Sequence, residues 1–381
     1  MFATLVGAYP RTPLPGQPFR LRAAYGQLER GEIDRDGFRD VQDKLVRELI
    51  EEQIDAGLSL LTDGQIRWED AQTAVARGLD GFEITGMLRY FDTNTYYRQP
   101  LATALPAWTH PILVADWRFA DAAARDAARE RDLEPLPVKA CLVGPYTLAR
   151  LSHAGEFSRE ALTMALAEAL GQEVRALVEA GAPVVQIDEN ALTMIAADDD
   201  DERALATRAL SRLCEAVADL PVAHLCLAVT MGSAEHAGAP LLYERPFKSY
   251  LFDLIAGPDN WRLIAYAPTD RGIICGAADA RNTARDDEPV LIWAARYAAT
   301  LNGRGLDRVG LAPSTGLEYL PRDRAKAKIE ALAEAARKAG LPGNELAKVI
   351  DPRAVDARSA ALGRHEPGTG TATARATGGQ P

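Results

Sequence analysis

Cysteine is scarce in this sequence. Its four residues, Cys141, Cys214, Cys226 and Cys275, are widely separated along a chain of 381 residues. This is unlike the dense cysteine pattern of small secreted domains, so we expect reduced thiols, of which one or more can bind a metal. Apolar runs long enough to cross a membrane are also missing, and the N-terminus lacks a basic segment followed by an apolar one. We therefore expect a cytoplasmic protein with no membrane partner.

A concentration of positive charge is missing as well. The formal net charge is -11, and the lysines and arginines form no basic cluster. Nucleic acids and anionic membranes attract basic surfaces, so neither is an expected partner. What the chain does contain, 47% hydrophobic and 25% charged residues, is typical of a soluble globular protein that is large enough to bury a core.

Short apolar runs alternate with segments of helical periodicity. We expect strands at residues 2–6, 58–61, 138–143, 183–187, 221–229, 262–266, 272–275 and 308–311. Helices are expected at residues 36–56, 159–180, 198–220, 245–255, 289–302 and 322–339. Eight short strands that alternate with helices favour the α/β class and a (β/α)8 TIM barrel, although an open parallel sheet stays possible because the pattern does not show closure.

Two segments differ from this alternation. Residues 81–129 are weakly periodic and rich in scattered aromatic residues, and a connection of that length is uncommon unless it has a role such as covering a pocket. Residues 352–381 are rich in Gly, Thr, Ala and Arg and contain no core residues. We expect a single barrel domain over residues 1–345 and a disordered tail over residues 352–381.

Many polar residues are expected at the carboxyl ends of the strands, where barrel enzymes place their working groups. They are Tyr9, Arg11, Asp63, Gln65, Arg67, Tyr146, Gln186, Asp188, Glu189, His224, Cys226, Asp279, Arg281, Ser314 and Thr315. Each has a purely structural alternative, since Asp188 can cap a helix and Asp279 can pair with Arg281. Their coincidence at one face predicts a functional site.

The expected strand at residues 221–229 carries two side chains that can bind metal. A period of two residues places His224 and Cys226 on the same face. An imidazole and a thiolate can supply half of a tetrahedral zinc shell. Histidine and cysteine are also common in protein cores, so a core pair remains the alternative.

Six motifs follow one another along residues 2–340: Val-Gly-Ala-Tyr-Pro-Arg-Thr, Leu-Leu-Thr-Asp-Gly-Gln-Ile-Arg, Leu-Val-Gly-Pro-Tyr-Thr-Leu, Val-Val-Gln-Ile-Asp-Glu-Asn-Ala-Leu, His-Leu-Cys and Ala-Pro-Ser-Thr-Gly-Leu. In this order they resemble the C-terminal catalytic domain of cobalamin-independent methionine synthase and its single-domain relatives. The resemblance implies a zinc-dependent barrel methyltransferase of methionine biosynthesis. It would move a methyl group from methyltetrahydrofolate to a small thiol such as homocysteine, whose sulfur zinc holds as the thiolate.

The resemblance also implies roles for single residues. His224 and Cys226 match two zinc ligands, and Asp279 or Arg281 serves the methyl-donor side. The implied substrate-binding residues are Gly7, Ala8, Gln65, Asp188 and Glu189. Among them, Asp188 matches the carboxylate that receives the ammonium group of the amino acid, and Gln65 stands where a second carboxylate is expected. Gly7 and Ala8 match the turn around the substrate carboxylate.

Several family positions are occupied by other residues. Thr315 replaces a cysteine ligand, Tyr266 stands near the place of a carboxylate ligand, and Arg281 replaces a histidine. With two of four ligands matched, weak zinc binding is expected.

Three interpretations follow. The first is zinc-dependent thiol methylation completed by other ligands, such as Cys275, Glu235 or His236. The second is a divergent enzyme with another methyl donor, such as a corrinoid protein, or another thiol acceptor resembling coenzyme M. The third is an amino-acid-binding barrel without catalysis.

Overall fold

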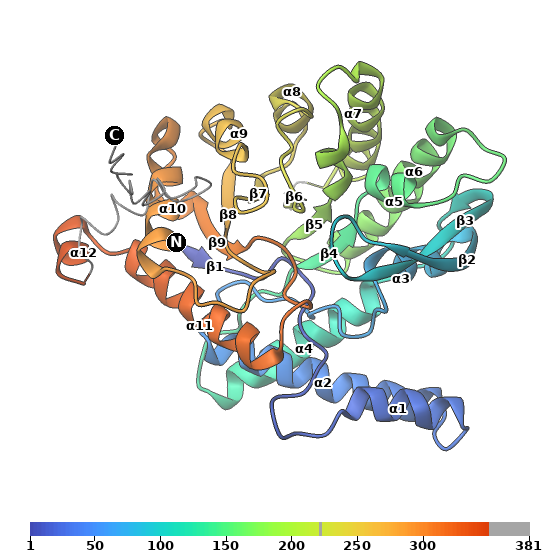
Figure 1. Cartoon of the computed structure of the whole chain (residues 1–381), viewed down its shortest axis with the longest axis horizontal. Coiled ribbons are helices and arrows are strands. Elements are labelled where there is room, and N and C mark those ends of the chain that lie inside the picture. Colours follow the sequence, from blue (N-terminus) through green and yellow to red (C-terminus); the bar gives the residue numbers. More distant parts are fainter. Residues whose placement is uncertain (221–222, 350–381) are drawn as a thin grey trace, which may run out of the picture.

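The computed structural model describes residues 1–220 and 223–349, and its centre is a parallel sheet that curls around on itself (Figure 1). Seven strands of the described chain pair in the order β1-β9-β8-β7-β6-β5-β4. They are β1 (Phe2–Ala3), β4 (Ala140–Val143), β5 (Val185–Asp188), β6 (Leu225–Val229), β7 (Ser249–Asp253), β8 (Gly272–Ala278) and β9 (Val309–Pro313). The expected tail at residues 352–381 lies outside the described residues.

The space between β1 and β4 is filled by a short extended segment. Thr4 forms a parallel bridge with Leu60, and Leu61 forms another with Val138. The Leu61 N–H donates to the carbonyl of Pro137 at 2.8 Å. These pairs join the two edges of the seven-stranded sheet through an eighth strand position. The (β/α)8 barrel expected from the sequence is therefore confirmed.

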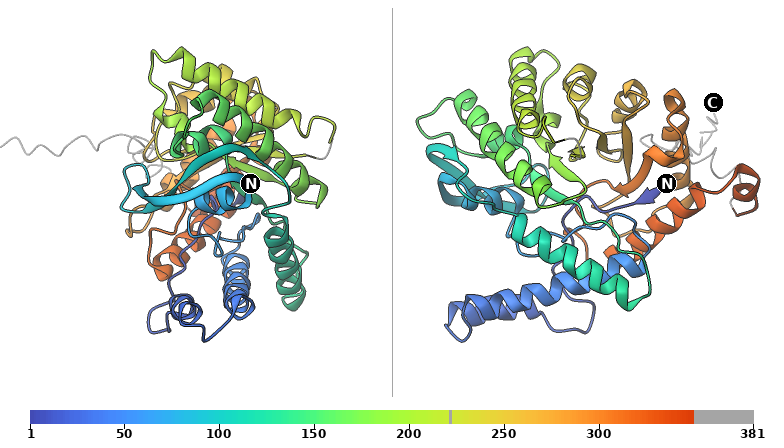
Figure 2. Two further views of the ribbon diagram at one scale, coloured as in Figure 1. Left: turned by 90° about the vertical axis from the view of Figure 1, so that its right-hand side faces the viewer. Right: turned by 180° about the vertical axis from the view of Figure 1, so that it is seen from behind.

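Helices surround the sheet on its outer side, as the views from the side and from behind also show (Figure 2). They are α1 (Arg20–Glu29), α2 (Arg35–Asp55), α3 (Ala71–Gly78), α4 (Val114–Glu130), α5 (Pro145–Leu151), α6 (Arg159–Glu179), α7 (Asp200–Glu215), α8 (Ala239–Tyr243), α9 (Asn260–Tyr266), α10 (Glu288–Thr300), α11 (Arg322–Ala339) and α12 (Gly343–Val349). Among these described helices, none combines the length and the apolarity that a membrane crossing requires.

The expectations for residues 245–255 and 262–266 are wrong. Residues 245–255, expected to be helical, contain β7, and residues 262–266, expected to be the sixth strand, lie in α9. All five residues of β7 are buried, so the strand lacks the alternation of polar and apolar side chains that marks a strand with one exposed face. Periodicity alone does not separate such a run from a buried helical segment.

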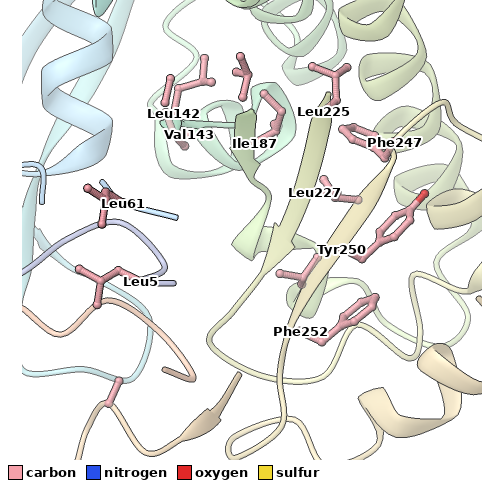
Figure 3. Packing of buried hydrophobic residues seen from close by; sticks show 14 of the residues in the cluster. Leu5, Leu61, Leu142, Val143, Ile187, Leu225, Leu227, Phe247, Tyr250 and Phe252 are labelled. Atoms are coloured by element: carbon pink, nitrogen blue, oxygen red, sulfur yellow. The ribbon is translucent and has the colours of Figure 1, made fainter. Parts of the chain in front are cut away.

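Alternating side chains divide the core into an outer and an inner layer. Leu225 and Leu227 of β6 point to the helices and lie beside Phe247, Tyr250 and Phe252 (Figure 3). A separate inner cluster contains Cys226 and Ala228 of the same strand together with Val6, Leu251, Ile274 and Ala312. Period two thus turns alternate residues of β6 into the interior of the barrel.

The segment at residues 81–129 is more ordered than its sequence suggests. It contains most of an antiparallel hairpin, β2 (Asp80–Arg89) with β3 (Tyr96–Ala107), and the alanine-rich helix α4. The hairpin is fastened to the loop after α5, where the Ala102 N–H donates to the His153 carbonyl at 2.9 Å and the His153 N–H donates to the Pro100 carbonyl at 2.8 Å. This attachment places the hairpin beside α3 and α6 (Figure 1).

One buried carboxylate fixes the chain between the hairpin and α4. Glu173 of α6 accepts hydrogen bonds from the indole of Trp108 at 2.7 Å and from the N–H groups of Ile112 and Leu113, each at 2.8 Å. It therefore satisfies two N–H groups at the start of α4 that have no partner inside the helix.

Replacing this carboxylate is expected to destabilise the protein. In Glu173→Gln, an amide that carries two donors of its own faces three donors, and the free energy of unfolding should fall by about 2 kcal/mol. Urea unfolding measures this change. The matched control is Glu168→Gln on the same helix, where an exposed carboxylate pairs with Arg212, and its effect should stay within about 0.5 kcal/mol. Equal effects of the two substitutions would contradict the anchoring role of Glu173.

Candidate functional site

A cavity of about 670 Å³ lies where the strands end. Its wall is formed by the turn after β1, residues near the closing segment, the ends of β4, β5 and β6, the loop after β9, the hairpin and α1. A parallel barrel places its binding site at this face because the loops after the strands meet there. The location agrees with the expectation that polar strand ends gather at one site.

Four of the expected substrate-binding residues come together in this wall. Gly7, Ala8, Gln65 and Asp188 all line the cavity, although they lie far apart in the sequence. A Cβ atom added to Gly7 would lie 2.8 Å from Nε2 of Gln65, so the two residues touch directly. Glycine at position 7 therefore allows the carboxamide of Gln65 to reach the turn after β1.

Backbone groups next to Gln65 are held in fixed positions. Gln65 has a φ of 52°, which is uncommon for a residue with a side chain, and its N–H donates to the carboxylate of Asp63 at 3.0 Å. The hydroxyl of Thr62 donates to the carbonyl of Gly7 at 3.0 Å. Within residues 1–220 and 223–349, the N–H groups of Gly7 and Ala8 have no hydrogen-bond partner. They are available to a ligand in the cavity.

Asp188 is the last residue of β5 and carries a carboxylate with an unusual proton affinity. Its Oδ1 accepts a hydrogen bond from Nε2 of Gln186 at 2.7 Å. Burial raises the pKa of Asp188 to about 7, although the hydrogen bond from Gln186 and the charge of Lys139 act in the opposite direction. The group therefore changes its charge near neutral pH.

Arg11 brings a positive charge into the same cavity. One of its terminal nitrogens donates to the backbone carbonyl of Glu69 at 3.2 Å, while its buried Nε has no hydrogen-bond partner. No ion pair joins Arg11 to a carboxylate in the described part of the chain. Burial also raises the pKa of Glu318, another carboxylate in the cavity wall, and the charge of Arg11 lowers it. The cavity wall thus contains a buried cation that forms no ion pair within the described residues, together with a second arginine, Arg22, and four carboxyl groups, those of Glu69, Asp70, Asp188 and Glu318.

Glu189 is turned away from the cavity and caps α5. Its carboxylate accepts the N–H groups of Tyr146 at 3.0 Å and Thr147 at 2.7 Å, and the hydroxyl of Thr147 at 2.6 Å. Burial raises the pKa of Glu189 to about 7. The observed contacts of Glu189 are those of a helix cap, whereas the cavity-facing member of this acidic pair is Asp188.

His224 and Cys226 lie near the opposite end of the barrel. β6 begins at Leu225 and ends at Val229, so His224 precedes the strand and Cys226 is its second residue. Nε2 of His224 is 2.9 Å from the hydroxyl of Ser249, the first residue of β7. Burial lowers the pKa of His224 and raises the pKa of Cys226. The expectation that this pair faces the mouth of the barrel is wrong.

The residues at the mouth do not fit zinc. Neither cysteine nor histidine lines the cavity. Among residues 1–220 and 223–349, no three His, Cys, Asp or Glu side chains are grouped in a way that could hold a metal ion. Two proposed substitute ligands are engaged elsewhere: Cys275 donates to the carbonyl of Ala294 in α10, and Glu235 pairs with Arg262.

Because residues 262–266 were expected to be the sixth strand, the sequence interpretation missed the carboxylate of Asp253. The sixth strand position is β7, so it ends at Asp253 rather than near Tyr266. Asp253 accepts the N–H groups of Ile255 at 2.9 Å and Ala256 at 2.8 Å, and that of Met231 at 3.2 Å. Burial raises the pKa of Asp253 to about 6. Its hydrogen bonds shape the loops after β6 and β7.

Asp279 and Arg281 connect the loop after β8 with the hairpin. Asp279 accepts the N–H of Arg281 at 2.9 Å, and the guanidinium of Arg281 pairs with Asp92 at 3.0 Å. Asp92 belongs to the tip between β2 and β3. The two residues are thus near the hairpin tip rather than in the cavity wall.

Asn190 is a further cavity residue that the sequence interpretation did not single out. Its amide donates to the hydroxyl of Tyr90 at 2.9 Å and accepts the N–H of Thr230 at 2.9 Å. It therefore joins the hairpin to the ends of β5 and β6. The next residue after Thr230, Met231, has a φ of 73°, and such strained backbone is common at binding sites.

Comparison with known proteins identifies a family for this chain. The family model described as "Cobalamin-independent synthase, N-terminal domain" matches residues 63–293. A curated protein named "Methionine synthase" from Saccharolobus solfataricus is 30% identical over 190 residues, which cover 50% of this chain and 52% of that protein. Its counterpart from Sulfurisphaera tokodaii is 31% identical over the same shares. The matched part of the chain thus spans about half the length of these relatives.

Two solved structures share the fold. A B12-independent methionine synthase from Shewanella sp. W3-18-1, solved in complex with selenomethionine, has a TM-score of 0.70 and 16% identity, covering 88% of this chain and 96% of that chain. A putative vitamin-B12 independent methionine synthase from Listeria monocytogenes has a TM-score of 0.67 and 17% identity, covering 90% and 98%. At these identities the likeness shows the fold.

The placement of Cys226 leads to a prediction about metal content. We expect Cys226→Ser to leave the zinc content of the purified protein unchanged, because its thiol lies inside the barrel with the inner apolar cluster. Elemental analysis of wild type and variant measures this. Cys275→Ser is the matched control, since it removes another buried thiol, on β8. Stoichiometric zinc that is lost only in Cys226→Ser would contradict the prediction and support His224 and Cys226 as zinc ligands.

Proposed function

This chain belongs to the cobalamin-independent synthase family, and we propose that it binds a small sulfur-containing amino acid in the mouth cavity and methylates its thiol. The matched family model describes the N-terminal domain, whereas the sequence motifs were compared with the C-terminal catalytic domain. The proposal therefore depends on the residues that line this cavity and not on the ligand set of the catalytic domain.

The distribution of charge in the cavity is the observation that carries the proposal. Asp188 supplies an anion for the ammonium group of an amino acid. Arg11 forms no ion pair within the described residues and supplies a cation whose Nε has no hydrogen-bond partner, and the free N–H groups of Gly7 and Ala8 supply further donors for the carboxylate. The ammonium group of a zwitterionic amino acid can bind Asp188 while its carboxylate binds Arg11 and the two N–H groups. Charged hydrogen bonds of this kind are stronger than neutral ones.

The rest of the cavity leaves room for a methyl donor. A volume of about 670 Å³ is typical of sites for ligands larger than a single amino acid. Tyr25 and Tyr96 line its outer part and offer aromatic surfaces to a planar donor such as methyltetrahydrofolate. Corrinoid-bound methyl and other thiol acceptors remain alternatives for the same site.

The reaction forms a carbon–sulfur bond as the bond between the methyl group and the donor breaks, and the thiol loses its proton. Glu318, whose pKa is raised by burial, is a cavity carboxylate that can accept this proton and pass it to the donor nitrogen of methyltetrahydrofolate, which keeps the electron pair of the broken bond, while Asp188 holds the ammonium group. Because the cavity wall lacks suitable ligands, no step is assigned to zinc. The same lack favours a second candidate function, an amino-acid-binding barrel without catalysis.

An assay of methyl transfer from methyltetrahydrofolate to homocysteine tests the proposal. We expect methionine to form, and Asp188→Asn to lower kcat/KM by about 10- to 100-fold, because a charged hydrogen bond is worth about 1.5–3 kcal/mol. Asp126→Asn is the control, because it removes an exposed carboxylate on α4 that lies outside the cavity wall. Product with methylcobalamin alone would identify the alternative donor. Tight binding of methionine without transfer from either donor would replace the proposal by the binding barrel.

Binding should depend on pH in a direction set by Asp188. Below its pKa of about 7 the carboxyl group is protonated and neutral, so an ammonium group is held less tightly. The affinity for methionine is expected to rise about tenfold from one pH unit below this value to one unit above it. Calorimetric titration of the wild type measures this rise, which should be absent in Asp188→Asn. An affinity that falls over this range would contradict the role of Asp188.

A further inference from the structure

A lysine is buried inside the barrel next to the strand that carries Asp188. Lys139 is only 2% exposed, directly before β4. Its ammonium group donates to the carbonyl of Leu5 and to Oε1 of Gln186, both at 2.6 Å. No ion pair joins Lys139 to a carboxylate within the described residues. A buried charge without a direct counterion is costly, so its neighbours must compensate for the loss of water.

The ammonium group fixes the orientation of the Gln186 carboxamide. An ammonium group has three donors and no acceptor, so only the oxygen of the amide can face it. The amide NH2 must then point the other way. It donates to the carbonyl of Val6 at 2.6 Å and to Oδ1 of Asp188 at 2.7 Å. The amide therefore presents a donor to Asp188, and an ionised carboxylate is the form that best accepts it.

We propose that Lys139 is a positioning residue that acts through Gln186 to keep Asp188 available as an anion facing the cavity. The hydrogen bonds run in one direction, from the ammonium to the amide oxygen and from the amide nitrogen to the carboxylate. If these hydrogen bonds ran in the opposite direction, the amide oxygen of Gln186 would face Asp188 and stabilise its protonated form instead. The functional consequence rests on the proposed binding of an ammonium group, whereas the effect on Asp188 itself does not.

The other titratable groups that act on or near Asp188 do not favour its ionised form. Glu318, on the loop after β9, raises the pKa of Asp188 as a like charge, in the same direction as burial. The charge of Asp188 in turn raises the pKa of four acids on neighbouring elements: Cys141, Cys226, Tyr90 and Glu189. Lys139 is the cation that opposes these influences.

Titration of Asp188 by carbon-13 NMR in the ligand-free protein tests the proposal. The Asp188 resonance is assigned as the one missing from Asp188→Asn. In Lys139→Met, which keeps the length of the side chain and removes the charge, the midpoint should move upward by about one pH unit or more. Gln186→Leu keeps the lysine and removes the connecting amide, so it should move the midpoint in the same direction. It also provides a second test if Lys139→Met does not fold.

Lys328→Met is the matched control. Lys328 is 4% exposed and pairs with Asp286 at 2.8 Å, so this variant also loses a buried lysine, away from the cavity wall. Its Asp188 midpoint should match that of the wild type. A folded Lys139→Met or Gln186→Leu variant with an unchanged midpoint would overturn the proposal. The titration needs neither substrate nor turnover. A failure of the methyl-transfer assay would therefore not affect the interpretation of the Asp188 midpoint.

Discussion

Closure of the sheet is the constraint on which the site depends. Gly7 follows β1, Gln65 follows the segment at residues 60–61, and Asp188 ends β5. These positions meet only because the bridges from Thr4 to Leu60 and from Leu61 to Val138 bring the two edges of the sheet together. An open sheet would leave β1 and β4 at opposite edges, and the cation of Arg11 would not share a cavity with the carboxylate of Asp188.

The sequence allowed the barrel and part of the site to be predicted, because strand ends can be located where an apolar run gives way to glycine or to polar residues. Gln65 and Asp188, which both line the cavity, were predicted in this way as residues at strand ends. His224 and Cys226 were expected at the mouth, but the expected strand and β6 both end at Val229, so these residues lie five and three positions before the carboxyl end. At about 3.3 Å per residue, three to five positions place a side chain about 10 Å or more below the mouth. Asp253 was missed for another reason: its strand is buried on every side and resembles a helix core.

The family resemblance identifies the family and its fold, whereas the polar groups of the cavity indicate which kind of ligand can bind. The order of the motifs reflects the order of the strands, so it identified the family even though zinc-ligand positions hold other residues. The polar groups that remain, Asp188, Gln65 and the turn at Gly7, are those that can recognise the common part of an amino acid. Lys139 and Gln186 support one of them from inside the barrel, at positions that sequence reading treats as core. Directed hydrogen bonds between buried groups are visible only once the side chains are placed.

The hairpin of β2 and β3 shapes the cavity from outside the barrel strands. Its tip and its second strand contribute Tyr90, Thr95, Tyr96 and Tyr97 to the wall, yet none of these residues belongs to the barrel strands. Tyr96 is exposed, so exchanges at this position can alter which molecules enter the cavity at little cost to the fold, whereas Tyr97 is buried and its hydroxyl donates to the carbonyl of Leu151 at 2.8 Å. The shape of the cavity entrance can therefore change through the exposed part of the hairpin while Asp188 keeps its contact with Gln186.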